Sequence, residues 1–194
     1  MRRLLKLFRE LIHSFLIGIF IFLCVSMSTQ NFRVEGESMA PTIKPNDRIF
    51  IDKISYVRLN FKKLGASLPF IEFNDKVLFA FDPPKRGDIL VFQYPENPSR
   101  SFIKRIIGLP GETVEIKNGI VRINGVILQE PYVMKNYTQD FISIRVPSKS
   151  YFVLGDNRRV SNDSRRWGVV PLTHAVGKTW IRYWPISQLS TSIE

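Results

Sequence analysis

The sequence predicts a mainly β protein, built on an antiparallel sheet, with one N-terminal transmembrane helix. After residue 30, short segments rich in Ile, Val, Phe and Tyr follow a period of two, and Gly, Pro and Asn separate them. Two Asn-Gly pairs lie between such segments, and this dipeptide is the strongest short-range signal for a β-hairpin. Before residue 30 the chain carries a continuous apolar run instead. With 194 residues, the chain is long enough to bury the core of one domain.

The first thirty residues predict a basic flank followed by a membrane anchor. Residues 1–10 carry four basic side chains and one acidic one, and we interpret them as a cytoplasmic N-terminus. Residues 11–29 contain the apolar run FLIGIFIFLCV and are the predicted transmembrane anchor, at the short end of the ~17 to 25 residues that span a bilayer as a helix. A cleavable secretory signal is the alternative, because Ser26-Met27-Ser28 has the small-x-small pattern of a cleavage site.

Residues 30–194 form the predicted β domain. Strands are expected, in chain order, at Arg48–Ile54, Asp88–Tyr94, Phe102–Leu109, Thr113–Lys117, Ile120–Ile123, Tyr151–Leu154 and Ala175–Tyr183. Asn118-Gly119 and Asn124-Gly125 should form tight turns of a β-meander, because both central positions of a type I′ turn need positive φ. Residues 58–84 mix Phe with Lys, which is typical of an insertion or excursion that contacts the membrane interface, or of an ordinary excursion with its own small core.

The net charge and the counts of Cys and His limit which partners, metals and cofactors the chain is expected to bind. The net charge of +11 would suit nucleic acid, acidic substrates or an anionic membrane surface. Lys and Arg are spread along the chain and no base-reading motif is present, so we expect no nucleic acid and favour a basic body that rests on anionic lipid. A single cysteine, Cys24, leaves no disulfide or cysteine-rich zinc site, and two distant histidines leave no other metal site, so no metal and no cofactor are predicted.

Two arrangements could activate a serine hydroxyl in this chain. A Ser-His-Asp triad would have to use His174, because the other histidine lies in the anchor. A Ser-Lys pair could use Ser38, in a tight segment bounded by Gly and Pro, and Lys104, which alternation places on the apolar face of its strand with Phe102 and Ile106. Full burial lowers the pKa of a lysine from ~10.4 by about 3 to 5. On these residues alone, a turn serine and a surface lysine remain the simpler interpretation.

Four segments together resemble the type I signal peptidases, the bacterial and organellar leader peptidases of the Ser-Lys serine protease family. They are Gly36-Glu-Ser-Met-Ala-Pro-Thr42, Arg86-Gly-Asp-Ile-Leu-Val-Phe92, Lys104-Arg-Ile-Ile-Gly-Leu-Pro-Gly111 and the stretch from Gly155-Asp-Asn-Arg158 to Trp167-Gly168. Their order and spacing cover most of residues 34 to 184. The resemblance implies a coiled β-barrel catalytic domain, similar to that of the self-cleaving repressor-type peptidases, which would carry a DNA-binding N-terminus in place of the anchor.

The resemblance also implies roles for single residues. Ser38 would be the nucleophile and Lys104 its general base, Ser161 would hydrogen-bond the Lys104 amine, and Asp163 and Arg165 would form a supporting charge pair. Gly36 stands where some family members carry a hydroxyl that completes the oxyanion hole. The residues expected to bind the small side chains of the substrate are Val34, Gly36, Met39, Phe102 and Ile103.

As partners, the resemblance implies preproteins with signal peptides and the lipid bilayer, with the translocation machinery as a further candidate. The expected location is the plasma membrane or a thylakoid or other organellar membrane, with the catalytic domain on the side opposite the cytoplasmic N-terminus. Two alternatives fit the same features: an organellar inner-membrane peptidase of the same mechanism, and a non-catalytic membrane-anchored β module that binds extended peptides.

Overall fold

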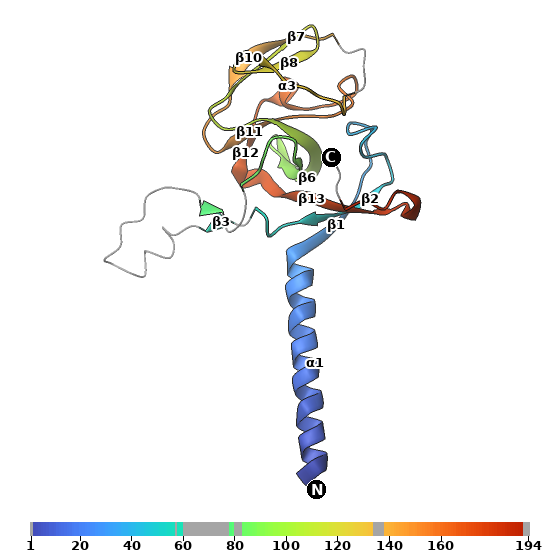
Figure 1. Cartoon of the computed structure of the whole chain (residues 1–194). Coiled ribbons are helices and arrows are strands. Elements are labelled where there is room, and N and C mark those ends of the chain that lie inside the picture. Colours follow the sequence, from blue (N-terminus) through green and yellow to red (C-terminus); the bar gives the residue numbers. More distant parts are fainter. Residues whose placement is uncertain (1, 57, 60–77, 80–82, 134–137, 192–194) are drawn as a thin grey trace, which may run out of the picture.

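A long N-terminal helix leads into a body made of β-sheets (Figure 1). The computed structural model describes residues 2–56, 58–59, 78–79, 83–133 and 138–191. Helix α1 spans Arg2–Ser28, so it begins inside the predicted basic flank and is longer than the predicted anchor. Its segment Phe8–Ser28 is long and apolar enough to cross a membrane, and none of it is buried against the body. A helix whose apolar side chains are exposed all round suits a bilayer rather than water.

The body contains a seven-stranded antiparallel sheet and a smaller four-stranded one. The large sheet has the order β1 (Thr29–Arg33), β2 (Arg48–Asp52), β13 (Ala175–Trp184), β5 (Ile89–Tyr94), β6 (Asn97–Gly108), β11 (Ser150–Leu154) and β12 (Val170–Pro171). The small sheet has the order β10 (Phe141–Arg145), β7 (Thr113–Lys117), β8 (Ile120–Ile123) and β9 (Val126–Ile127). Short helices are α3 (Ser164–Trp167), η1 (Leu172–His174) and η2 (Ile186–Gln188). The predicted mainly β, antiparallel class is confirmed.

The predicted strands are all present, with differences at their ends. The meander of β7 and β8 has the expected bounds, and its turn has φ of 51° at Asn118 and 73° at Gly119, as a type I′ turn requires. Strand β6 begins five residues before the predicted start at Phe102, because Asn97 already pairs with Tyr94 of β5. Residue 29, predicted to end the anchor, instead begins β1.

The predicted excursion at residues 58–84 lies largely outside the described residues. Its described parts are a short antiparallel pair, β3 (Arg58–Leu59) with β4 (Leu78–Phe79), and the stretch that leads into β5. The prediction of a membrane-contacting insertion there stays a prediction.

One core cluster fixes the segment that follows β1 onto the large sheet. Its buried members are Val34, Met39, Ile43, Ile49, Ile51, Ile89 and Val91. They come from β2, β5 and the connection between β1 and β2, so burying them holds residues 34–43 against the two strands. A second cluster packs the small sheet onto β6 and β11 through residues such as Ile107, Val114 and Phe152. The connection that carries Ser38 is therefore fixed by side-chain packing rather than by strand pairing.

A glycine in β13 should be required by close packing. A Cβ built on Gly177 would lie 2.5 Å from the backbone oxygen of Asp52, which cannot move without disturbing β2. Gly177→Ala should therefore lower the free energy of unfolding of the full chain in detergent by about 1 to 3 kcal/mol. Gly36→Ala is the matched control, because a Cβ there meets no atom within 4 Å. Equal unfolding midpoints for the two variants would contradict the packing of β13 on β2.

Candidate active site

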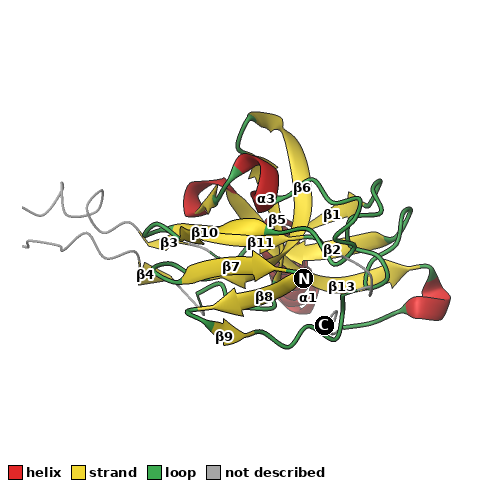
Figure 2. Cartoon of the chain, turned by 90° about the horizontal axis from the view of Figure 1, so that it is seen from above, coloured by secondary structure: helices red, strands yellow, loops and turns green. Residues whose placement is uncertain are grey.

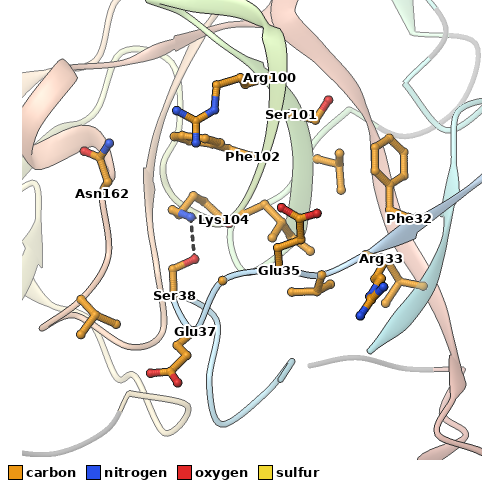
Figure 3. Close-up of a pocket in the computed structure, with 16 residues that line it drawn as sticks. Phe32, Arg33, Glu35, Glu37, Ser38, Arg100, Ser101, Phe102, Lys104 and Asn162 are labelled. Carbon is orange, nitrogen blue, oxygen red and sulfur yellow. Dashed lines mark hydrogen bonds between the residues drawn. The ribbon is translucent and has the colours of Figure 1, made fainter. Parts of the chain in front are cut away.

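Ser38 and Lys104 meet at the edge of an open cleft, although 66 residues separate them in the sequence (Figure 3). The Lys104 Nζ lies 2.7 Å from the Ser38 Oγ, within hydrogen-bond distance. The same amine donates to the carbonyl oxygen of Ile103 at 2.7 Å. These contacts aim the amine at the serine hydroxyl, which is the geometry that a general base needs.

The Lys104 side chain is nearly removed from water, with 4% of its surface exposed. It lies against the Phe102 ring, whose centroid is 5.4 Å from the amine. Burial lowers the pKa of Lys104 to about 8, while the charges of Asp163 and Asp156 oppose this by favouring the protonated form. A substantial fraction of the amine is therefore neutral at mildly alkaline pH, as a proton acceptor must be.

Alternation along β6 sends the next residue, Arg105, to the other face of the strand. Arg105 is also buried, and it binds Asp156 through two hydrogen bonds of 2.9 and 2.8 Å. It donates a further bond to the carbonyl oxygen of Gly87 and stacks over the Tyr132 ring. This pair anchors the strand that carries Lys104 to the segment around Asp156.

The same carboxylate reaches the serine segment. Thr42 donates its hydroxyl to Asp156 Oδ2 at 2.6 Å, and the backbone N–H of Asn157 donates to the carbonyl oxygen of Ser38 at 3.0 Å. Asp156 thus joins the segment that carries Ser38 to Arg105, the neighbour of Lys104. Sequence reasoning missed Thr42, Arg105 and Asp156 as parts of the site. The one available signal was an arginine inside an apolar strand, since a buried guanidinium needs a carboxylate partner.

Asp163 and Arg165 form the predicted charge pair. Arg165 binds Asp163 through two hydrogen bonds of 2.7 and 2.8 Å and also donates to the carbonyl oxygen of Arg158. Asp163 is the N-cap of α3 and accepts from the backbone N–H of Gly155 at 3.1 Å. The pair therefore fixes the chain between Gly155 and α3 behind the lysine.

Ser161 differs from the expectation. Its side chain is buried, but its hydroxyl has no hydrogen-bond partner among the described residues, and the carbonyl oxygen of Ile103 takes the bond from Lys104 that was expected for Ser161. Ser161 still lies close to the nucleophile, because a Cβ built on Gly155 would collide with both the Ser161 hydroxyl and the Ser38 carbonyl oxygen.

A cleft of about 590 Å³ opens beside the Ser38–Lys104 pair. Residues 32–38 form one wall and residues 100–104 form the other (Figure 3). Four of the five predicted substrate-binding residues line it: Val34, Gly36, Phe102 and Ile103. Met39 does not line the cleft, because its side chain is fully buried in the core cluster with Ile43 and Ile49. The residue after the nucleophile thus holds the segment in place instead of contacting a ligand.

The alternative base, His174, lies elsewhere. Its Nδ1 is 3.1 Å from the carbonyl oxygen of Gln93, and the residue does not line the cleft. Within the described part of the chain, no group of three His, Cys, Asp or Glu side chains could hold a metal ion.

Comparison with known proteins assigns the chain to a family. The model of a family described as signal peptidase, peptidase S26, matches residues 8–184. The chain belongs to this family. The signal peptidase I of Leptolyngbya laminosa is 40% identical over 80% of this chain and 69% of its own, and that of Bacillus caldolyticus is 34% identical over 82% of each. The chloroplastic thylakoidal processing peptidase 1 of Arabidopsis thaliana is 34% identical over 82% of this chain and 43% of its own.

The pH dependence of peptide cleavage by this member of the signal peptidase family should follow the deprotonation of the Lys104 amine. Because the pKa of Lys104 is lowered to about 8, kcat/KM for peptide cleavage should rise with pH and level off above that value. At about pH 6 only about 1% of the amine is neutral, so the rate should be about 100-fold below the plateau. A profile that is already flat at pH 6, or that still rises above pH 10, would show a different base.

The Asp163→Asn variant tests whether the midpoint of the pH profile reports the pKa of Lys104. The Asp163 charge raises the pKa of Lys104, so removing it should move the midpoint of the profile to lower pH, while Asp163→Glu should leave the midpoint near its original value. A shift of the Asp163→Asn midpoint to higher pH would contradict the electrostatic assignment.

Proposed function

We propose that this chain is a membrane-anchored serine endopeptidase that removes N-terminal signal peptides from translocated preproteins. The observation that carries the proposal is the 2.7 Å contact between Ser38 Oγ and a buried lysine amine beside an open cleft, in a chain of the signal peptidase family. Ser38 is the proposed nucleophile and Lys104 the proposed general base.

The proposed reaction proceeds in two halves. Ser38 Oγ forms a bond to the scissile carbonyl carbon while its proton moves to the neutral Nζ of Lys104. The oxyanion of the tetrahedral intermediate accepts a hydrogen bond from the backbone N–H of Ser38. As the intermediate collapses, the carbon–nitrogen bond breaks and Lys104 returns the proton to the leaving amine. Water then attacks the carbonyl carbon of the acyl-enzyme while Lys104 takes a proton from the water. The ester bond to Ser38 Oγ breaks and Lys104 returns the proton to that oxygen, so the peptide leaves with a new carboxyl group and the serine hydroxyl is restored.

Gly36 supplies no side-chain donor to the oxyanion hole. Some family members place a hydroxyl at this position, and here a Cβ on Gly36 would enter open space within the cleft. The backbone N–H of Ser38 is therefore the donor that the proposal assigns, and the space at Gly36 is left for the substrate backbone.

The proposed specificity is for small residues at the first and third positions before the bond. An extended peptide laid between residues 32–38 and 100–104 would place alternate side chains against the cleft wall. Val34 and Ile103 make that wall apolar and shallow, so larger side chains are rejected by collision. The peptide is proposed to come from a preprotein that the translocation machinery delivers.

The proposed orientation places the basic N-terminus in the cytoplasm and the β domain across the membrane. Because β1 begins directly after α1, the cleft wall at Phe32 and Arg33 lies only a few residues from the end of the membrane segment. The active site would therefore stay near the lipid surface, where the end of a signal peptide emerges. The membrane itself is proposed to be a plasma or thylakoid membrane, and the relatives include a bacterial signal peptidase and a thylakoidal processing peptidase.

Cleavage of a preprotein with an Ala-x-Ala site, in detergent, tests the function. Ser38→Ala and Lys104→Ala should each lower kcat by several orders of magnitude, because the hydroxyl and its base act as one unit. His174→Ala, the matched control, should retain activity, since His174 lies outside the cleft. An inactive but folded His174→Ala beside an active Lys104→Ala would move the base to His174 and overturn the proposed mechanism.

A further inference from the structure

The cleft wall beside Ser38 carries a glutamate without a partner. Glu35 lines the cleft three residues before the nucleophile, and it is exposed. Among the described residues its carboxylate takes part in no hydrogen bond or ion pair, unlike Asp156 and Asp163, which are each bound by an arginine. The cleft therefore contains a negative charge that the protein does not neutralise and that the proposed chemistry of Ser38 and Lys104 does not use.

The opposite wall offers a free strand edge to a peptide. On one side of β6, Phe102 and Ile103 pair with β5, whereas pairing with β11 on the other side begins only at Arg105. Among the described strands, residues 100–104 thus have one unpaired edge, and these residues line the cleft. Figure 2 shows one end of β6 rising out of the body. An extended peptide can pair its backbone with such an edge.

Alternation determines where the side chains of such a peptide point. The proposed function puts the side chains at the first and third positions before the bond against Val34 and Ile103. Successive side chains of a strand point to opposite faces, so the second one points the other way, toward the mouth of the cleft. Val34 is buried in the core whereas its neighbour Glu35 is exposed, so Glu35 also lies on the side of the mouth. The second side chain before the bond would therefore meet Glu35.

An aromatic ring lies on the other side of that position. Phe102 is the neighbour of Ile103 on β6, so its ring is on the opposite face of the strand, the face that the second side chain shares. The ring already contacts cations, because the Lys104 amine and the Arg100 guanidinium carbon each lie 5.4 Å from its centroid. Figure 3 shows the Glu35 carboxylate raised from its own wall toward the wall that carries Phe102. An aromatic face beside a free carboxylate suits a long basic side chain, whose stem covers the ring while its charged end reaches the carboxylate.

Arg100 is a competing charge on the wall that carries Phe102. It is exposed and lies on the same face of β6 as Phe102. Counting along β6 from Ile103, which the first side chain faces, the second side chain is level with Phe102. The fourth is level with Arg100, two residues or about 7 Å farther along the strand. Glu35, and not Arg100, is therefore the nearer charge at the second position.

We propose that Glu35 selects a basic residue, Lys or Arg, at the second position before the scissile bond, so that the preferred site is small–basic–small. This inference rests on the proposed function and refines its substrate. Glu35 pairs with the charged end of the basic side chain, while the stem of that side chain lies on the Phe102 ring. Collision at the first and third positions decides whether a peptide enters, and the charge at the second position decides how well it is retained.

The test measures kcat/KM in detergent for three peptides that differ only at the second position before the bond: Ala-Lys-Ala, Ala-Gln-Ala and Ala-Glu-Ala. One exposed ion pair changes an equilibrium by roughly 1.4- to 5-fold. With about 3-fold attraction for Lys and about 3-fold repulsion for Glu, the Lys-to-Glu ratio of kcat/KM should be about 10-fold larger in wild type than in Glu35→Gln. High salt should reduce this difference.

Glu37→Gln is the matched control. Glu37 is an exposed glutamate in the same wall, but Figure 3 shows its side chain pointing in a different direction from that of Glu35. Whatever its effect on the rate itself, Glu37→Gln should leave the Lys-to-Glu ratio within about 2-fold of wild type. Glu35→Lys should invert the preference, so that the Ala-Glu-Ala peptide becomes the better substrate.

An unchanged Lys-to-Glu ratio in Glu35→Gln would overturn the inference. So would an equal fall in Glu37→Gln, because it would show a general field of the wall instead of a contact at one position. The uncharged Ala-Gln-Ala peptide separates this inference from the proposed function. If wild type cleaves it and the ratio does not depend on Glu35, the selectivity is wrong and the proposed function stands; if the folded wild type cleaves none of the three peptides, the proposed function fails as well.

Discussion

The contact between Lys104 Nζ and Ser38 Oγ requires an amine kept out of water, and much of the surrounding structure serves that requirement. Desolvation lowers the pKa of the amine, whereas the nearby charges of Asp163 and Asp156 raise it. Each of these carboxylates is bound by an arginine through two hydrogen bonds. The acids that fix the backbone around the site are thus largely neutralised by their own partners, which allows desolvation to prevail.

Geometry is maintained by a network behind the site rather than by the reacting side chains. Asp156 accepts hydrogen bonds from Thr42, in the segment that carries Ser38, and from Arg105, the neighbour of Lys104. One carboxylate therefore holds the serine segment and the lysine strand at a fixed separation. Removing one partner of such a buried ion pair costs about 3 to 5 kcal/mol, because the other charge is left buried without compensation. Loss of Asp156 would therefore damage both stability and the Ser38–Lys104 distance.

The parts that sequence could predict are those set by local periodicity and turn chemistry. The β7–β8 hairpin follows from Asn118-Gly119, and the orientation of Lys104 follows from alternation in β6. Strand β1 could not be predicted, because its residues are mostly polar and it forms by pairing with the distant β2. The burial of Met39 and the unpartnered Ser161 hydroxyl depend on tertiary packing, so a motif cannot reveal them.

The central claim is that burial lowers the pKa of Lys104 far enough for a substantial fraction of its amine to be neutral at mildly alkaline pH, and direct titration of the amine tests this claim most directly. The measurement is an NMR titration of the full chain in detergent with isotope-labelled lysine. The Lys104→Met variant assigns the signal. A pKa of about 8 for Lys104 is the predicted result. A pKa near the ordinary lysine value of ~10.4 would mean that the amine is charged and cannot act as the base, and would contradict the account.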